Sequence, residues 1–167
     1  MKDGPPRDVL ALTRALVGAL AVPVIVNDRV DVALAVGADA VQRTSTSLAI
    51  QDIRAVADKR LRIGVSTHSL EEAVEAELKG ADWVVFGPVY DTPSKRPYGP
   101  PQGLERLARV AEAVRLPVIA IGGITPDRVR NVLRAGARGI AVISAIIATE
   151  SPADATRRFL DALDRGA

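Results

Sequence analysis

Short apolar runs rich in Val and Ile alternate with longer segments of helical spacing along nearly the whole chain. The runs are continuously apolar, which is typical of strands buried on both faces of a parallel sheet. Strands that alternate with helices indicate an α/β fold with right-handed crossovers. The expected strands are 23–27, 39–42, 62–66, 82–86, 117–121 and 138–142. The expected helices are 6–20, 28–36, 50–58, 69–79, 103–115, 126–135 and 152–165.

Capping residues stand at several expected helix ends. The segment from Ser69 to Glu72 has the Ser-x-x-Glu pattern of a capping box. Thr125 followed by Pro126 is typical of an N-cap and a first helical position. Gly37, Gly80 and Gly136 each follow an expected helix, where a left-handed residue is common.

Three of these helix ends share one repeated sequence pattern. The segments VGADAV (36–41), KGADWV (79–84) and AGARGI (135–140) each join a helix end to a strand start. No G-x-G-x-x-G follows the first expected strand, so the dinucleotide-binding fold is disfavoured. Repeated βα units favour a (β/α) barrel type of fold.

Composition excludes several classes of function. Aromatic residues make up only 3% of the chain, too few for a base-stacking surface that binds single-stranded nucleic acid. The net charge is +2 and the charges are interspersed, without the basic stripe of a nucleic-acid binder. The chain has no Cys, which excludes disulfides and thiol catalysis. No run reaches the ~20 apolar residues of a membrane span, and we expect a cytoplasmic protein.

Two turns after the last expected strands have the residues of a phosphate site. Gly122 and Gly123 follow strand 117–121, and Ser144 opens a helical turn after strand 138–142. In a (β/α) barrel a phosphate often binds between the last two loops. Glycine allows close backbone approach, and N–H groups at a helix start bind anions. The pattern predicts a phosphate cradle, with simple tight turns as the alternative.

Further polar residues lie at or just after the ends of two expected strands. Asn27 and Asp28 close the first strand, where Asp28 could bind Mg²⁺ or cap the next helix. His68, the single histidine, follows the third strand. Its position allows acid/base chemistry near neutral pH, and a surface residue in a capping turn is the alternative.

The long polar loop 87–103 is a candidate functional loop. It holds Thr92, Ser94 and Lys95, two hydroxyls and a cation that suit a phosphate or pyrophosphate. A solvated, charged loop without a ligand is the alternative.

Five segments together resemble the thiamine-phosphate synthase/TenI superfamily. They are NDRVDVALAVGADAV, IGVSTHSLEEAVEAE, FGPVYDTPSK, PVIAIGGITPDRV and GIAVISAI. The resemblance covers nearly the whole chain and implies one TIM-type (β/α)₈ barrel domain over residues 1–167. It implies that a hydroxymethylpyrimidine pyrophosphate is joined to a thiazole phosphate with the help of Mg²⁺. The partners would be small phosphorylated substrates, without nucleic acid or membrane. The sequence leaves open whether the chain is a monomer or a homo-oligomer.

The resemblance also implies a role for each matching residue. Asp28 would bind Mg²⁺, and Lys95 would be catalytic. Little acid/base chemistry is needed, so binding and charge stabilisation would dominate. Substrate-binding roles would fall to Lys2, Asn27, Ser66, Thr92, Ser94, Gly123, Ile143 and Ser144.

One departure from the family pattern concerns the metal. Synthases usually place an Asp, a second Mg²⁺ ligand, where this chain has Ser47. A hydroxyl is a poorer Mg²⁺ ligand than a carboxylate. TenI-type proteins share this Ser-rich turn, and His68 matches their acid/base histidine. A thiazole tautomerase is therefore the second hypothesis, and a non-catalytic thiazole-phosphate-binding protein or fragment is the third.

A second departure lies at the N-terminus. Lys2 and Asp3 match the end of the family's second strand, and the Gln and Arg before it have no counterpart. A complete barrel takes about 250 residues, and only six strands are expected here. We therefore expect an N-terminally truncated barrel that lacks the first βα unit and most of the second strand.

Overall fold

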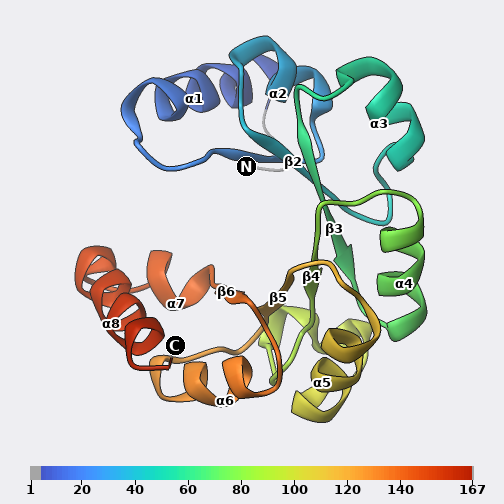
Figure 1. The fold of residues 1–167 in the computed structure, drawn as a ribbon. Helices are drawn as coiled ribbons and strands as arrows, with labels where there is room; N and C mark the ends of the chain where they lie inside the picture. Colours follow the sequence, from blue (N-terminus) through green and yellow to red (C-terminus); the bar gives the residue numbers. More distant parts are fainter. Residues whose placement is uncertain (1–4, 167) are drawn as a thin grey trace. The chain divides into compact units, whose positions relative to one another are not determined.

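The computed structural model describes residues 5–166, which divide into two compact units. Unit 1 contains the described residues up to Ser66 together with Lys79–Asp82. Unit 2 contains Thr67–Leu78 and the described residues from Trp83 onward. In each unit, helices lie along three parallel strands, as Figure 1 shows.

Unit 1 forms because its strands bury one face against helices. Val26, Val41 and Ile63 are paired across the three strands and are at most 6% exposed. Pairing across the parallel strands places side chains of the same parity on the same face. The elements in chain order are α1 (Pro6–Ala19), β1 (Ile25–Asn27), α2 (Val30–Val36), β2 (Ala40–Arg43), α3 (Ile50–Ala57) and β3 (Arg62–Thr67), whose last residue belongs to unit 2.

Unit 2 repeats the same arrangement with more helices. Val84 pairs with Val118 and Phe86 with Ala120, and all four are buried. The elements are α4 (Leu70–Leu78), β4 (Trp83–Phe86), η1 (Pro93–Tyr98), α5 (Gly103–Ala113), β5 (Val118–Ile121), η2 (Pro126–Arg128), α6 (Val129–Arg134), β6 (Gly139–Ala141), α7 (Ser144–Ile147) and α8 (Pro152–Asp164). The η elements are 3₁₀ turns.

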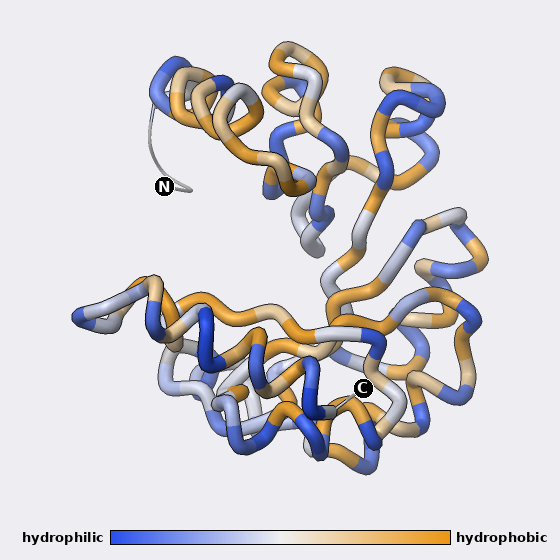
Figure 2. The backbone as a smooth tube through the Cα atoms, turned by 60° about the vertical axis from the view of Figure 1, so that its left-hand side comes forward, coloured by the Kyte–Doolittle hydropathy of each residue, from blue (hydrophilic) through white to orange (hydrophobic). Residues whose placement is uncertain are grey.

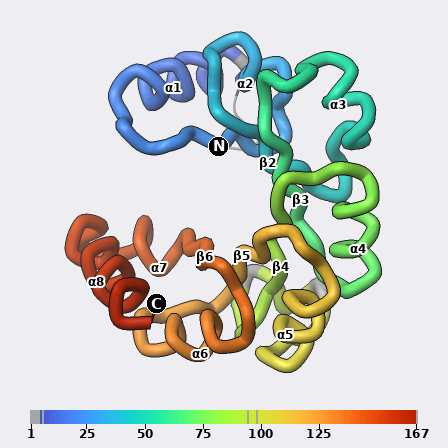
Figure 3. The backbone as a smooth tube through the Cα atoms, in the orientation of Figure 1, coloured from blue at the N-terminus to red at the C-terminus, as the bar shows by residue number. Residues whose placement is uncertain are grey.

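The predicted α/β class and the six parallel strands are confirmed, and Figure 3 follows the alternation along the chain. Each expected strand matches an observed one within two residues at either end. The expected helix 126–135 is a 3₁₀ turn followed by α6, and the loop 87–103 contains the turn η1. The (β/α)₈ barrel type, its N-terminal truncation and the single domain stay predictions, and the oligomeric state stays open.

The predicted capping box at α4 is confirmed. Ser69 Oγ accepts a hydrogen bond from the Glu72 backbone N–H at 3.2 Å. The Glu72 carboxylate reaches back and accepts from the His68 N–H at 2.6 Å. Two N–H groups at the helix start are thereby satisfied. The predicted left-handed glycines are also confirmed, with φ of 69°, 85° and 91° at Gly37, Gly80 and Gly136.

Hydropathy follows the secondary structure in both units. Figure 2 shows hydrophobic residues along the strands and polar residues at intervals along the helices. None of the helices in the described part of the chain combines the length and apolarity that crossing a membrane requires.

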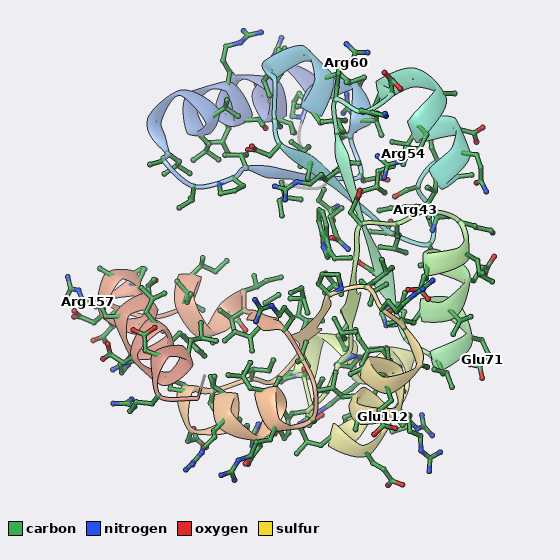
Figure 4. All side chains as sticks on the ribbon, viewed as in Figure 1. Arg43, Arg54, Arg60, Glu71, Glu112 and Arg157 are labelled. Carbon is green, nitrogen blue, oxygen red and sulfur yellow. The ribbon has the colours of Figure 1, made fainter. Side chains whose placement is uncertain are left out.

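One polar cluster fixes the turns of unit 1. Arg54, labelled in Figure 4, donates from Nη1 to Leu61 O at 2.8 Å and from Nη2 to Gly80 O at 3.0 Å. Nη2 also contacts Asp82 Oδ2 at 2.7 Å, and that oxygen accepts from Ile63 N at 2.6 Å. The Arg54 side chain therefore links α3 to segments on both sides of β3.

We predict that Arg54→Ala lowers the free energy of unfolding by about 1.5 to 3 kcal/mol, because it removes hydrogen bonds to a charged donor. Arg60→Ala is the matched control, because the Arg60 guanidinium donates to Val56 O and Ala57 O at the end of its own helix. It should cost less than about 0.5 kcal/mol. Urea unfolding measures both, and equal losses would contradict the linking role of Arg54.

Candidate functional site

Polar side chains lie near the carboxyl ends of the unit 1 strands, on one face of the sheet. Asn27 pairs with Gln42, and Gln42 pairs with Gly64. Ser66 lies two residues beyond Gly64 and so shares its face. Gln42 Nε2 donates to Ser66 Oγ at 3.0 Å, which confirms that these two side chains meet. Asn27, Gln42 and Ser66 thus lie on the face opposite the helix-covered Val26, Val41 and Ile63.

Asp28 adopts an uncommon backbone conformation directly after β1. Its φ is +67°, a left-handed value that Asp tolerates better than most residues. Its N–H donates to Gln42 O at 2.9 Å, and its carboxylate accepts a short hydrogen bond from Ser47 Oγ. The capping alternative for Asp28 is wrong, because Arg29 is the N-cap of α2 and that helix has no side-chain cap.

Ser47 is held against Asp28 by its own turn. The Thr44 N–H donates to Ser47 Oγ at 2.8 Å, and the Ser47 N–H donates to Thr44 O at 3.2 Å. The hydroxyl therefore stands beside the Asp28 carboxylate. Among the described residues there is no group of three or more His, Asp or Glu side chains that could hold a metal ion.

In unit 2 the segment after β4 lies directly on the glycine turn after β5. Val89 N donates to Ile121 O at 2.8 Å, and Tyr90 N donates to Gly122 O at 3.0 Å. A Cβ on Gly122 would come within 2.5 Å of Pro88, and one on Gly123 within 2.6 Å of Asp91 O. Both glycines have positive φ, 100° and 60°. The absence of side chains here is therefore what lets the two segments pack.

The loop 87–103 is fixed at its base and braced by an ion pair. Gln102 N donates to Pro88 O at 2.8 Å and closes the base. Arg96 contacts Asp91 with two nitrogens, at 3.0 and 2.5 Å. The hydrogen bond from the Arg96 guanidinium lowers the pKa of the Asp91 carboxyl below its ordinary value.

The predicted loop residues lie in or beside η1. Thr92 precedes η1, and its hydroxyl donates to Tyr90 O at 2.9 Å. Lys95 N donates to Thr92 O at 2.8 Å, and the Lys95 side chain is exposed. Ser94 lies within η1. Lys2 lies outside the described residues.

The second predicted phosphate turn lies beside the first. Ile121 pairs with Ala141, so the turns after β5 and β6 leave the sheet at the same edge. Ile143 is 62% exposed, and Ser144 begins α7. Since α7 has only four residues, anion binding there would depend on single N–H groups and not on a helix dipole.

His68 contacts the backbone after β4. Its Nδ1 lies 2.5 Å from Gly87 O, and Gly87 N donates to Thr67 O at 3.3 Å. A carbonyl oxygen only accepts, so Nδ1 carries the hydrogen and Nε2 is the basic nitrogen of the neutral ring. His68 also lines a pocket of about 240 Å³ together with Phe86 and the α5 arginines Arg106 and Arg109.

Sequence reasoning missed Arg128 and Tyr90. Arg128 Nη1 donates to Gly123 O at 2.7 Å, and the guanidinium carbon lies 4.5 Å from the centroid of the Tyr90 ring. The sequence signal for Arg128 was weak, because the residue lies two positions after Pro126, where the pattern predicts an ordinary helix start.

Comparison with known proteins places these residues in a family. The profile of the family described as thiamine monophosphate synthase matches residues 2–146. The thiamine-phosphate synthase of Roseiflexus castenholzii is 45% identical over 163 residues, which cover 96% of this chain and 72% of the relative. That of Anaeromyxobacter dehalogenans is 43% identical over 169 residues, 99% of this chain and 76% of the relative.

A solved structure agrees with the sequence relatives. The thiamine phosphate pyrophosphorylase from Pyrococcus furiosus matches with a TM-score of 0.91 and 40% sequence identity. The match covers 99% of this chain and 81% of that protein.

The packing at Gly122 predicts a larger loss of stability there than at another left-handed glycine. Gly122→Ala should lower the free energy of unfolding by about 2 to 5 kcal/mol, since a Cβ adds overlap with Pro88 to the strain of positive φ. Gly80→Ala is the control, with φ of +85° and no atom within 4 Å, and should cost about 1 to 2 kcal/mol. Urea unfolding compares them, and a smaller loss at Gly122 would contradict the packing.

Proposed function

Because the chain belongs to the thiamine monophosphate synthase family, we propose that it joins a hydroxymethylpyrimidine pyrophosphate to a thiazole phosphate, giving thiamine phosphate and pyrophosphate. The protein is then a transferase of thiamine biosynthesis. The observation that supports this proposal within the fold is the Gly122–Gly123 turn, where the N–H groups of Gly123 and Ile124 donate no turn or loop hydrogen bond among the described residues. The similar proteins described above are named thiamine-phosphate synthase or thiamine phosphate pyrophosphorylase.

The bond changes of this reaction require little acid/base chemistry from the protein. The carbon–oxygen bond to pyrophosphate breaks with its electron pair on the leaving group, and the pyrimidine methylene becomes cationic. The thiazole nitrogen then supplies the electron pair for the new carbon–nitrogen bond. Positioning and charge stabilisation therefore dominate over proton transfer.

The residues of unit 2 are proposed to bind phosphate groups. The N–H groups of the Gly123 turn, with Ile143 and Ser144 beside it, would receive the thiazole phosphate. Ser94 would donate a hydroxyl hydrogen bond to a phosphate oxygen, and Thr92 would do the same after its hydroxyl turns away from Tyr90 O. Lys95 would place its ammonium against charge that builds up on the pyrophosphate.

The residues of unit 1 are proposed to meet the pyrophosphate and Mg²⁺. Asp28 with its partner Ser47 offers hard oxygen donors, which fit Mg²⁺. Mg²⁺ usually takes only one or two carboxylates and completes its shell with substrate phosphates and water. When bound, the ion would neutralise charge on the leaving group. Asn27 and Ser66 would donate to pyrophosphate oxygens on the same sheet face, and Lys2 would add a cation.

His68 is not needed as an acid or base in this reaction. Its Nδ1 already binds Gly87 O, and its N–H binds Glu72. These contacts support a role in holding the start of α4 against the segment after β4. The tautomerase hypothesis is therefore not required to explain the histidine.

We predict that the full chain forms thiamine phosphate from both substrates with Mg²⁺, detected by chromatography. Asp28→Asn should lower the rate at least about 100-fold, because it removes the one carboxylate at the proposed ion. Asp31→Asn is the control, since Asp31 is paired with Arg29 on the protein surface and should keep the wild-type rate.

Two outcomes would contradict this proposal. Equal rates for Asp28→Asn and Asp31→Asn would remove the metal role of Asp28. Binding of thiazole phosphate without any product would instead identify the chain as a non-catalytic binder.

Ser47 provides a separate test of the metal site. Ser47→Asp places a second carboxylate beside Asp28, so without Mg²⁺ it should lower the free energy of unfolding by about 1 kcal/mol through repulsion. Millimolar Mg²⁺ should then raise its Tm more than that of the wild type, because an ion bound only by the folded state stabilises it. Ser45→Asp, on an exposed position of the same turn, is the control. Equal responses of the two variants to Mg²⁺ would place the ion elsewhere.

A further inference from the structure

We propose that Arg128 is a positioning residue that holds the Gly122–Gly123 turn in the form that binds phosphate. The proposal rests on the function proposed above, because it concerns the turn assigned to the thiazole phosphate. All the groups involved lie in unit 2, on β5, its following turn, η2 and the segment after β4.

Both carbonyl oxygens of the turn are already bound. Gly122 O accepts from the Tyr90 N–H at 3.0 Å, and Gly123 O accepts from Arg128 Nη1 at 2.7 Å. In a trans peptide the C=O and the following N–H point in opposite directions. The N–H groups of Gly123 and Ile124 therefore point away from these two donors. Neither N–H donates a turn or loop hydrogen bond within the described part of the chain.

Two successive N–H groups left unpaired in this way form an anion-binding arrangement. Backbone amides that converge in a turn make a concave site for phosphate oxygens. The glycines have positive φ and no side chain, so the turn has many alternative conformations unless its carbonyls are held. Arg128 holds the second carbonyl and so orients the Ile124 amide.

Arg128 itself is held by Tyr90. Its guanidinium carbon lies 4.5 Å from the ring centroid, within the range of a cation–π contact. Stacking on the ring fixes the plane of the guanidinium, and the N–H donors lie in that plane. Tyr90 is in turn bound to the turn through its own N–H. Arg128 therefore connects the glycine turn to the segment that covers it.

This role predicts an effect on phosphate binding more than on the chemical step. Without Arg128 the turn must be ordered when phosphate arrives, and that cost weakens binding. A lost interaction that acts on bound substrate and transition state alike raises KM and leaves kcat unchanged.

The first test follows the amides directly. In ¹⁵N NMR titrations of the full chain with inorganic phosphate, the Gly123 and Ile124 signals should shift, and Arg128→Ala should weaken this response about tenfold. Arg130→Ala is the matched control, with the same loss of charge on an exposed position of α6. Responses that are equal in the two variants would overturn the proposal.

The second test uses the reaction. Arg128→Ala should raise KM for the thiazole phosphate about tenfold, with kcat and the KM for the pyrimidine pyrophosphate within about twofold of the wild type. Arg128→Lys should recover part of the loss, because its ammonium can donate to the same carbonyl. A fall in kcat alone, with KM unchanged, would overturn the positioning role.

Tyr90 keeps the proposal testable should Arg128→Ala fail to fold. Tyr90→Leu removes the ring beneath Arg128 and should raise KM in the same direction by about threefold. Tyr90→Phe keeps the ring beneath Arg128 and should raise KM less than Tyr90→Leu does. If the Leu and Phe variants bind phosphate equally well, the stacking has no positioning role and the proposal fails.

The two proposals fail in different ways. A wild-type chain that makes no product, yet shows the phosphate response at Gly123 and its loss in Arg128→Ala, would contradict the synthase function alone. An active wild type with an unaffected Arg128→Ala would contradict only the role of Arg128.

Discussion

The close approach of the Pro88–Asp91 segment to the Gly122–Gly123 turn is the contact on which the candidate site of unit 2 depends. Two backbone hydrogen bonds, from Val89 and Tyr90, continue the pairing of β4 and β5 beyond the strands themselves. Side chains at either glycine would prevent this approach. Sequence, backbone conformation and packing are therefore coupled at one point, and the loop and the turn cannot vary independently.

The same contact decides which backbone groups remain for a ligand. The covering segment and Arg128 bind the carbonyl oxygens of Gly122 and Gly123, whereas the N–H groups of Gly123 and Ile124 donate no turn or loop hydrogen bond among the described residues. A surface of donors alone favours anions over neutral ligands. The selectivity for phosphate that we propose for the turn would thus follow from the hydrogen bonds behind it.

Much of this was predictable from the sequence because it depends on local rules. The apolar runs predict the strands, and Asp28, Ser66 and Gly123 were predicted as site residues because they lie at or beside the strand ends. The choice between metal ligand and helix cap at Asp28 was not predictable. It depends on a positive φ and on Ser47, which comes from the next strand's turn. Arg128 and Tyr90 were missed for a similar reason: their contact joins two different loops, and neither residue type indicates it alone.

Ser47 changes how a metal ion could be bound under the proposed function. One carboxylate with a hydroxyl partner attracts Mg²⁺ less than two carboxylates do. The same lower negative charge also repels a pyrophosphate less. The affinity for the ion then depends on oxygens that the substrate brings, so Mg²⁺ and pyrophosphate would bind together more tightly than either alone. By linkage, each raises the affinity of the other by the same factor. A chain with Ser47 thus remains compatible with Mg²⁺-assisted chemistry, because the substrate supplies the charge that the protein lacks.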